Sequence, residues 1–143
     1  LYRFGNAATA EHFIRRYWSP MLIYLDDTMW EDFADNSELL RGGTMSHAWS
    51  SAPTYYMSTQ ILGVQLGFPV ETDLKTIRIE PQAESITWAR GNVPHPNGTV
   101  FVDWSVKGNN LFLNYTAPAG TDVVVAPKGK LASYTLWING IKK

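Results

Sequence analysis

The stretch VFVDWSVKGNNLFLNY, residues 100–115, consists of two runs in which apolar and polar residues alternate, separated by turn-forming residues. Alternation is the pattern of a β-strand with one buried face. Gly108, Asn109 and Asn110 favour a tight turn. The segments 100–104 and 111–115 are therefore predicted to pair as a hairpin.

Four further short segments around this hairpin have the composition of strands. They are residues 76–80, 85–88, 122–126 and 134–138, and Asn139-Gly140 supplies another turn signal after the last of them. Several short strands with turn signals between them are typical of a sandwich. We therefore predict an antiparallel β-sandwich over residues 70–143.

The first 69 residues have a different period. Apolar side chains recur every three or four positions from Ala7 to Leu22, which predicts a helix that ends near Pro20. A second helix is predicted to begin at Pro53 and to stop at Gly67. The long connection between them, residues 25–52, is of a length that is more often functional than idle. The fold class is thus predicted to be α+β, with residues 1–69 helical and residues 70–143 a sandwich.

The two helices cannot bury both of their apolar faces against each other alone. The chain also opens on Leu1 rather than on methionine. We therefore expect it to be the C-terminal portion of a larger protein. The alternative is that the helices pack across the sandwich.

Composition narrows the classes of partner. The net charge is -1, and no group of lysines or arginines is larger than a pair such as Arg15-Arg16, so nucleic acid is not an expected partner. No apolar run reaches the ~20 residues of a membrane span, so no membrane partner is expected either. The sequons at Asn97 and Asn114 favour a secreted or periplasmic protein over a cytoplasmic one.

No cofactor and no metal site are predicted. The chain contains no cysteine, and its three histidines do not have the spacing of metal ligands. Asp26, Asp27 and Asp35 of the acidic loop could offer oxygen atoms to calcium, but the loop lacks the EF-hand pattern, so no calcium site is predicted.

Three segments carry a family resemblance. They are FIRRYWSPMLIYLDDTMWEDF (13–33), SHAWSSAPTYYMSTQILGV (46–64) and IRIEPQAESITWARGNVPHPNGTVFVDW (77–104). Together they resemble the end of the bacterial and fungal α-L-rhamnosidases of glycoside hydrolase family 78, most strongly in TMWEDF and SHAWSSAP. The resemblance implies that residues 1–69 are the last helices and an active-site loop of an (α/α)6 toroid of helical hairpins. It also implies that a rhamnose-containing glycoside or polysaccharide is the substrate and the rest of the toroid a partner.

The resemblance implies that Glu31 is the general base of an inverting mechanism. Such a mechanism needs two carboxyl groups about 6.5–9.5 Å apart, one to protonate the leaving oxygen and one to activate water. The neighbouring Trp30 is expected to keep the Glu31 carboxylate partly dry, which would raise its basicity. The other acidic residues of this region are expected to be helix caps, partners of backbone amides or solvated charges, namely Asp26, Asp27, Asp32 and Asp35.

Three further residues are predicted to bind the sugar. The resemblance implies that His47 contacts rhamnose hydroxyls, and a neutral imidazole can both donate and accept hydrogen bonds. Trp30 and Trp49 are predicted to line the site, since aromatic faces suit sugar rings. A histidine satisfied within a loop and tryptophans packed between helices are the structural alternatives.

The chain also departs from the family pattern. Nothing in it corresponds to the acidic motif that carries the general acid, and Tyr24-Leu25-Asp26-Asp27 replaces a segment of small residues. The 143 residues alone are therefore expected to be inactive. A non-catalytic carbohydrate-binding or structural sandwich module and a six-hairpin glycosidase with another sugar specificity remain the alternatives.

Overall fold

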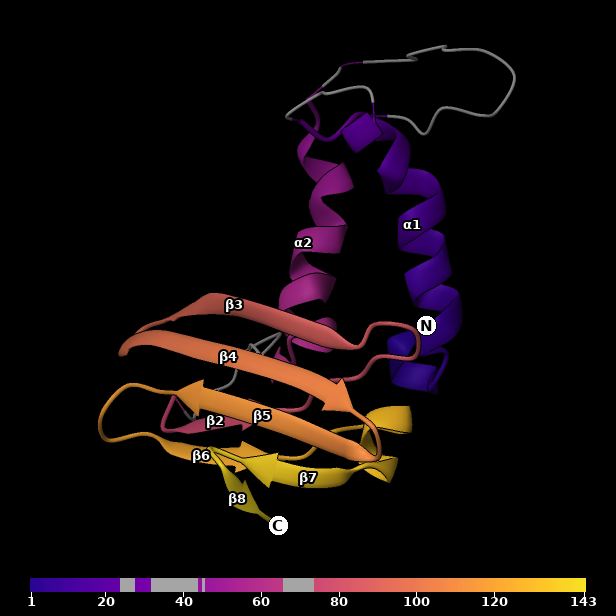
Figure 1. The fold of residues 1–143 in the computed structure, drawn as a ribbon. Coiled ribbons are helices and arrows are strands. Elements are labelled where there is room, and N and C mark those ends of the chain that lie inside the picture. Colours follow the sequence, from indigo (N-terminus) through magenta and orange to yellow (C-terminus); the bar gives the residue numbers. More distant parts are fainter. Residues whose placement is uncertain (24–27, 32–43, 45, 66–73) are drawn as a thin grey trace.

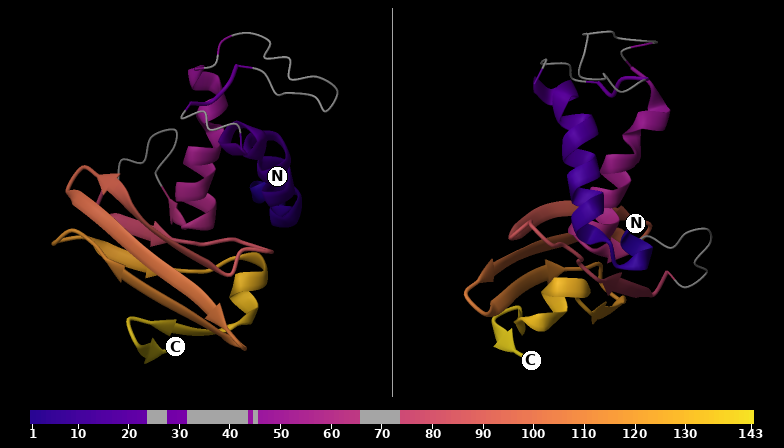
Figure 2. Two further views of the ribbon diagram at one scale, coloured as in Figure 1. Left: turned by 45° about the horizontal axis from the view of Figure 1, so that its top comes forward. Right: turned by 90° about the vertical axis from the view of Figure 1, so that its right-hand side faces the viewer.

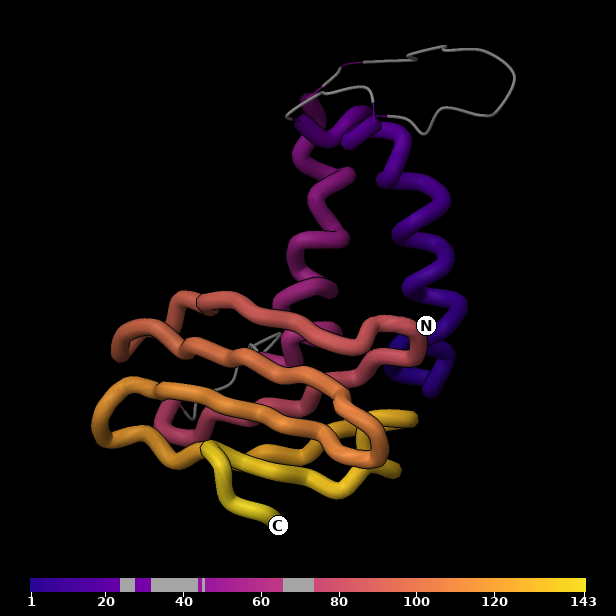
Figure 3. Tube along the Cα trace, in the orientation of Figure 1, coloured from indigo at the N-terminus to yellow at the C-terminus, as the bar shows by residue number. Residues whose placement is uncertain are grey.

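The structure is a computed structural model that describes residues 1–23, 28–31, 44, 46–65 and 74–143. Two helices stand side by side on one edge of a two-layered β domain, and the chain ends within that domain (Figures 1 and 2). The trace in Figure 3 follows the chain from the helices into the strands. Most of the connection between the helices, including Asp26, Asp27, Asp32 and Asp35, lies outside the described residues.

The first helix, α1, spans Ala7–Ile23 and follows a short 3-10 turn at Tyr2–Phe4. It continues through Pro20, so the predicted end at this proline is wrong. Proline fixes φ near its helical value and removes one backbone donor, a loss that packing can outweigh. Met21 is fully buried immediately after Pro20, which explains why the last turn stays helical.

The second helical segment is shorter than predicted and changes its winding. A 3-10 turn at Ala48–Ser51 leads into α2, Ala52–Tyr56, which continues as a π-helical turn at Met57–Ile61. Pro53 lies in the first turn of α2, as expected. The stop is at Gly63, where φ is +95°, rather than at Gly67.

The described residues form eight strands. Their bounds are β1 Val64–Gln65, β2 Thr76–Ile79, β3 Trp88–His95, β4 Gly98–Lys107, β5 Asn110–Thr116, β6 Asp122–Val125, β7 Thr135–Ile138 and β8 Ile141–Lys142. A further 3-10 turn occupies Gly129–Ser133. The hairpin predicted from residues 100–115 is confirmed, with Lys107 opposite Asn110. The strand predicted at residues 85–88 is wrong, because β3 begins where that segment ends.

The strands form two sheets, of orders β1-β2-β6 and β3-β4-β5-β7-β8. Most neighbours are antiparallel, as predicted, but β2 pairs with β6 and β5 pairs with β7 in parallel. Parallel neighbours need longer connections than hairpins. The segment between β5 and β7 fits this rule, since it contains the whole of β6 and the 3-10 turn.

One apolar core runs through the β domain and into the foot of the helices. It includes Val100, Val102 and Trp104 of β4 and Leu111 and Leu113 of β5, all fully buried. The same cluster contains apolar residues from the helical part, namely Tyr2, Ala7, Ala10, Ile61 and Leu62. The helices are therefore attached to the sandwich by shared packing as well as by the chain.

Two buried polar contacts reinforce this attachment. The Glu11 carboxylate of α1 accepts hydrogen bonds from the backbone N–H groups of Glu84 (2.7 Å) and Ser85 (2.9 Å) and from the Ser85 hydroxyl. The indole N–H of Trp104 donates to the carbonyl of Ile61 at 2.9 Å, next to the end of the second helical segment. The predicted boundary between residues 69 and 70 lies outside the described residues and stays a prediction.

Among the described residues, no helix has the length and apolar character needed to cross a bilayer.

Candidate functional site

Two short segments come together at the end of the helices that is far from the sheets. The backbone N–H of Glu31 donates to the carbonyl of Thr44 at 2.9 Å, and the backbone N–H of His47 donates to the carbonyl of Met29 at 2.8 Å. The Ser50 hydroxyl donates to the carbonyl of Trp30. These contacts hold residues 28–31 beside Thr44 and residues 46–50, although Glu31 and Thr44 are 13 positions apart in sequence.

Helix α1 fixes the same region from the other side. The indole N–H of Trp18 donates to the carbonyl of Ser50 at 2.7 Å. This hydrogen bond joins the C-terminal half of α1 to the 3-10 turn that precedes α2. The segment that carries His47 and Trp49 is therefore anchored to both the acidic segment and the helix.

The two oxygens of the Glu31 carboxylate have different surroundings. Oε2 accepts hydrogen bonds from the backbone N–H of Thr44 at 2.7 Å and from the Thr44 hydroxyl at 3.2 Å. Oε1 faces Nε2 of His47 at 4.0 Å, which is too long for a direct hydrogen bond. A water molecule or a sugar hydroxyl can sit beside this pair and contact both atoms.

The pKa of Glu31 lies below its ordinary value, so the expectation of a raised basicity is wrong. The largest cause is the backbone N–H of Thr44, which stabilises the charged carboxylate. Partial burial acts in the opposite direction and raises the pKa, but the Thr44 hydroxyl and the neighbouring His47 lower it further. Glu31 is therefore ionised at neutral pH and ready to accept a proton.

His47 is oriented by its own backbone neighbourhood. Its Nδ1 accepts a hydrogen bond from the backbone N–H of Trp49 at 3.4 Å, which also caps the 3-10 turn. In the neutral imidazole this leaves the proton on Nε2, the nitrogen that faces Glu31. His47 can thus donate a hydrogen bond to an oxygen atom placed next to the Glu31 carboxylate.

The two tryptophans predicted to line the sugar site, Trp30 and Trp49, lie in different environments. Trp30 is only 4% exposed, whereas Trp49 is 65% exposed. The indole N–H of Trp49 donates to the carbonyl of Glu31 at 2.8 Å, and its ring lies 4.1 Å from the imidazole of His47. The structure thus brings Glu31, His47 and Trp49 together, with an open aromatic face on Trp49. The sugar-lining role of Trp30 stays a prediction, and its burial leaves it little surface for a ligand.

Thr44 is a residue of this cluster that the sequence analysis did not identify. Its contribution depends on the return of the chain to Glu31 after 13 positions, and nothing in the local sequence specifies that return. The only signal is its place at the start of the polar stretch TMSHAWSS, residues 44–51.

We expect the substitution Thr44→Ala to raise the pKa of Glu31, because it removes the hydroxyl hydrogen bond that stabilises the carboxylate. The backbone N–H of residue 44 remains, so part of the lowering should remain. The measurement is an NMR titration of the Glu31 carboxyl carbon in the 143-residue chain. Thr44→Ser keeps the hydroxyl and serves as the control. An unchanged pKa in Thr44→Ala would contradict the described contact.

No group of three or more metal-ligating side chains occurs among the residues that the structure describes. Asp26, Asp27 and Asp35, the residues that could offer oxygen atoms to calcium, lie outside them.

Residues 63–134 match the model of the bacterial alpha-L-rhamnosidase C-terminal domain family. The match covers half of the chain. The chain belongs to this family. The resemblance to rhamnosidases noted in the sequence is thereby confirmed, and the chain contains a module that accompanies a glycoside hydrolase. Comparison with curated proteins and with solved structures gives no significant match.

The rhamnosidase C-terminal domain extends in this chain from Gly63, through β1 to β6, to the residue before β7. The match therefore falls on the strand-rich part and not on TMWEDF or SHAWSSAP, where the resemblance is strongest in the sequence. Glu31, His47 and Trp49 all precede it. Their roles have to be argued from their own geometry.

Proposed function

We propose that the chain is the C-terminal part of an inverting α-L-rhamnosidase in which Glu31 is the general base. One observation carries the proposal. Glu31 has one carboxylate oxygen held by Thr44 and the other turned to Nε2 of His47, beside the exposed ring of Trp49. A carboxylate that can activate water is one of the two carboxyl groups that an inverting glycosidase needs, and a hydrogen-bond donor and an aromatic face beside it suit a sugar.

In the proposed reaction a water molecule binds to Oε1 of Glu31. Its oxygen forms a bond to the anomeric carbon of a terminal α-L-rhamnose while the bond from that carbon to the glycosidic oxygen breaks. Glu31 takes the proton of the water, and a second carboxylic acid gives a proton to the leaving oxygen. The lowered pKa of Glu31 keeps it in the ionised form that this step needs.

The neighbours of Glu31 have distinct roles in this proposal. Thr44 fixes the carboxylate through Oε2, so that Oε1 points to the water. His47 donates a hydrogen bond to a rhamnose hydroxyl, and Trp49 packs against the sugar ring. Trp30 is assigned to the wall of the same site, with its buried side chain supporting the segment that carries Glu31.

From the family resemblance we expect the general acid in a preceding part of the helical toroid. The two helices of this chain would then complete that toroid, and the rest of the enzyme would be their partner. The 143 residues alone are expected to hydrolyse nothing, because a base without its acid does not open the glycosidic bond at a useful rate.

The substitution Glu31→Gln in the full-length protein tests the proposal. We expect turnover of an aryl α-L-rhamnoside to fall by about 100-fold or more, because the amide cannot accept the proton of the water. Substrate affinity should stay within a few-fold, since glutamine has nearly the same shape. Steady-state kinetics measure both parameters.

Glu84→Gln is the matched control, because Glu84 is an exposed acid next to the sandwich and should leave turnover unchanged. Near-normal turnover in Glu31→Gln would remove Glu31 from the mechanism. Aryl fucosides and aryl glucosides, tested in parallel with the parent protein, separate a rhamnosidase from a six-hairpin glycosidase that acts on another sugar.

A non-catalytic role is the second candidate, and the extent of the family match favours it. The matched residues contain the strands but not Glu31, and a sandwich that accompanies an enzyme can serve binding or structure alone. The gene upstream of this segment distinguishes the two candidates. Further helical hairpins with an acidic motif favour the enzyme, whereas a second sandwich favours the module.

A further inference from the structure

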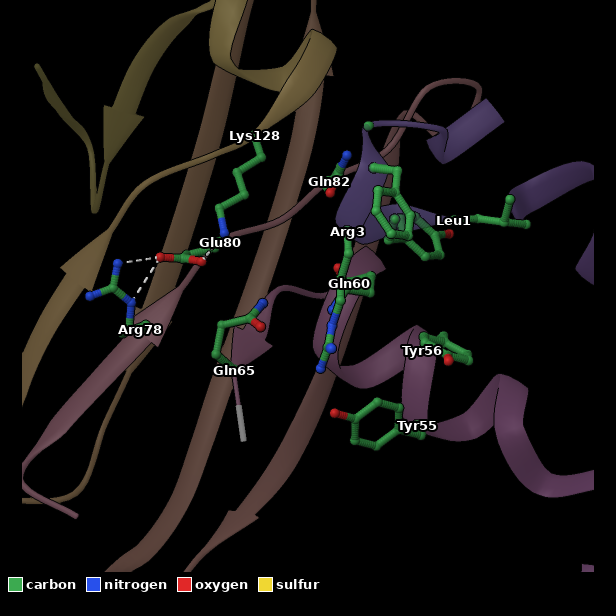
Figure 4. Close-up of a pocket in the computed structure, with 13 residues that line it drawn as sticks. Leu1, Arg3, Tyr55, Tyr56, Gln60, Gln65, Arg78, Glu80, Gln82 and Lys128 are labelled. Atoms are coloured by element: carbon green, nitrogen blue, oxygen red, sulfur yellow. Dashed lines mark hydrogen bonds and ion pairs between the residues drawn. The ribbon is translucent and has the colours of Figure 1, made fainter. Parts of the chain in front are cut away.

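A second polar site lies at the opposite end of the helices, where they meet the sandwich. It is a cleft of about 840 Å³ between the N-terminal turn, the second helical segment, β1, β2 and Lys128 (Figure 4). We refer to it as the Arg3 cleft, and its polar lining includes Arg3, Tyr55, Gln60, Gln65, Gln82 and Lys128. Helix α1, with 17 residues, is about 25 Å long and separates this end from the Glu31 cluster.

The Arg3 cleft carries an excess of positive charge. Among the lining residues that the structure describes, three side chains are cationic, those of Arg3, Arg78 and Lys128, against one carboxylate, that of Glu80. Arg78 and Lys128 both bind that carboxylate, which is almost completely buried. Together they hold the pKa of Glu80 below its ordinary value, although burial, the largest single influence, raises it. Glu80 is therefore already paired twice, and no other carboxylate among the described lining residues neutralises Arg3.

Arg3 is the cation without a partner. Its guanidinium has neither an ion pair nor a hydrogen bond with any residue that the structure describes, and in Figure 4 its side chain extends between the lining residues towards Tyr55. A guanidinium presents a planar set of donors that matches a carboxylate with two parallel hydrogen bonds. The cleft therefore offers an anchoring point for an anion.

The remaining lining is suited to sugar hydroxyls. Gln82 is a buried residue whose side chain lines the cleft, and its side-chain amide makes no hydrogen bond with the described part of the chain. A donor and an acceptor are therefore left for a ligand. The amide nitrogen of Gln65 donates to the carbonyl of Thr59, which leaves its oxygen as an acceptor. Tyr55 and Tyr56 lie edge to face and line the same cleft, with their side chains exposed.

We propose that the Arg3 cleft binds a sugar carboxylate, that is, a hexuronate residue of an acidic oligosaccharide. The carboxylate pairs with Arg3, the ring hydroxyls bind the glutamine amides, and the ring packs against Tyr55. A neutral sugar would leave the guanidinium unpaired in the cleft, so the charge favours the acidic sugar. This site does not depend on Glu31, because it concerns binding at a different place and needs no catalysis.

Isothermal titration calorimetry on the 143-residue chain tests this proposal. The probes are galacturonate and glucuronate trisaccharides, the same trisaccharides with their carboxyl groups reduced to alcohols, free glucuronate and a hexaglutamate peptide. We expect the acidic trisaccharides to bind at least 10-fold more tightly than their reduced forms, because only they pair with Arg3. Free glucuronate should bind more weakly than the trisaccharides if the ligand is an internal residue of a longer chain.

Three variants sharpen the test. Arg3→Met keeps the length of an exposed side chain but removes its charge, and it should weaken binding of the acidic trisaccharides at least 10-fold. Arg90→Met removes an arginine of β3 that does not line the cleft and should leave binding unchanged. Tyr55→Leu should weaken acidic and reduced trisaccharides alike. Circular dichroism confirms that each variant is folded.

Three results would overturn the proposal. The first is equal affinity for the acidic and the reduced trisaccharides. The second is an absence of binding up to millimolar concentrations. The third is binding of the hexaglutamate peptide as tight as that of the trisaccharides, which would identify the Arg3 cleft as a surface for an acidic polypeptide.

Discussion

The substitution Gly63→Ala is expected to lower the free energy of unfolding by about 2–5 kcal/mol, more than an alanine at any other glycine that the structure describes. Two costs combine at this position. Gly63 has φ of +95°, which a residue with a Cβ atom adopts only with strain. In addition, a Cβ atom placed there would lie 2.3 Å from the backbone nitrogen of Pro81. The obstacle is backbone, so no side-chain rotation can relieve the clash.

Gly120→Ala separates the two costs. Gly120 also has a positive φ, +78°, but a Cβ atom there would meet nothing within 4 Å. It should therefore cost only the strain, about 1–3 kcal/mol. Urea denaturation of the two variants and the parent chain gives the comparison. Equal destabilisation by both substitutions would mean that the chain between α2 and β1 does not pass as close to Pro81 as described.

The same close approach has a functional consequence. Gly63 ends the second helical segment and lets the chain turn directly into β1, whose Val64 and Gln65 pair with Ile79 and Arg78 of β2. That turn brings Gln65 to the wall of the Arg3 cleft, opposite the N-terminal turn. Acidic trisaccharides should accordingly bind less well to Gly63→Ala wherever the folded form persists.

The elements predicted correctly from the sequence are those that local signals specify. The hairpin of residues 100–115 has alternation on both sides of a turn, and Gly108 adopts the positive φ that this turn needs. Asn139 and Gly140 both have positive φ between β7 and β8, the conformation that favours an Asn-Gly hairpin turn. In each case the information lies within a few residues.

The errors concern contacts between distant segments. β3 runs through Gly91 and Pro94, which are poor strand residues, because it pairs along its whole length with β4. β1 was predicted as helix, and it becomes a strand because β2 offers it an edge. The parallel pairs β2–β6 and β5–β7 likewise join segments that are far apart in the sequence, so the local sequence does not predict their pairing. Periodicity alone contains none of this information.

The residues of the candidate site also fall into those that the sequence identifies and those that depend on contacts between distant segments. Glu31, His47 and Trp49 were identified because their motifs resemble a family, and the structure places them side by side. Thr44 was missed, and the lowered pKa of Glu31 with it, because both arise from the return of the chain to residues 28–31. The sequence shows which charged residues lie next to Glu31 in the chain. It does not show that the backbone N–H of Thr44, 13 positions away, donates a hydrogen bond to the Glu31 carboxylate.

The substitution Trp104→Ala is expected to lower the free energy of unfolding by about 4–6 kcal/mol. Trp104 is 0% exposed in the centre of β4, so its removal leaves a large cavity, which costs about 3–5 kcal/mol. The loss of its hydrogen bond leaves the carbonyl of Ile61 without this partner and adds about 1 kcal/mol. Few other residues of the described chain combine both roles.

Trp104→Phe distinguishes the two terms. Phenylalanine keeps most of the apolar volume but cannot donate to Ile61, so this variant should lose about 1–3 kcal/mol. Trp88→Ala is the control, since Trp88 is 66% exposed and its removal should cost about 0.5 kcal/mol or less. Urea denaturation measures all three variants against the parent chain. A loss in Trp104→Ala no larger than that in Trp88→Ala would contradict its place in the core.

Trp104 also connects the sandwich with the candidate site. Its hydrogen bond holds one end of the segment 48–61, and the other end follows His47 directly. Trp104→Phe removes the hydrogen bond at the Ile61 end of this segment. The His47 end is held separately by its contacts to Met29, Trp30 and Glu31. We therefore expect the NMR signals of the His47 ring to stay unchanged in Trp104→Phe. Broadening or displacement of those signals would show that the C-terminal domain positions the candidate site through this helix, without contributing a residue to it.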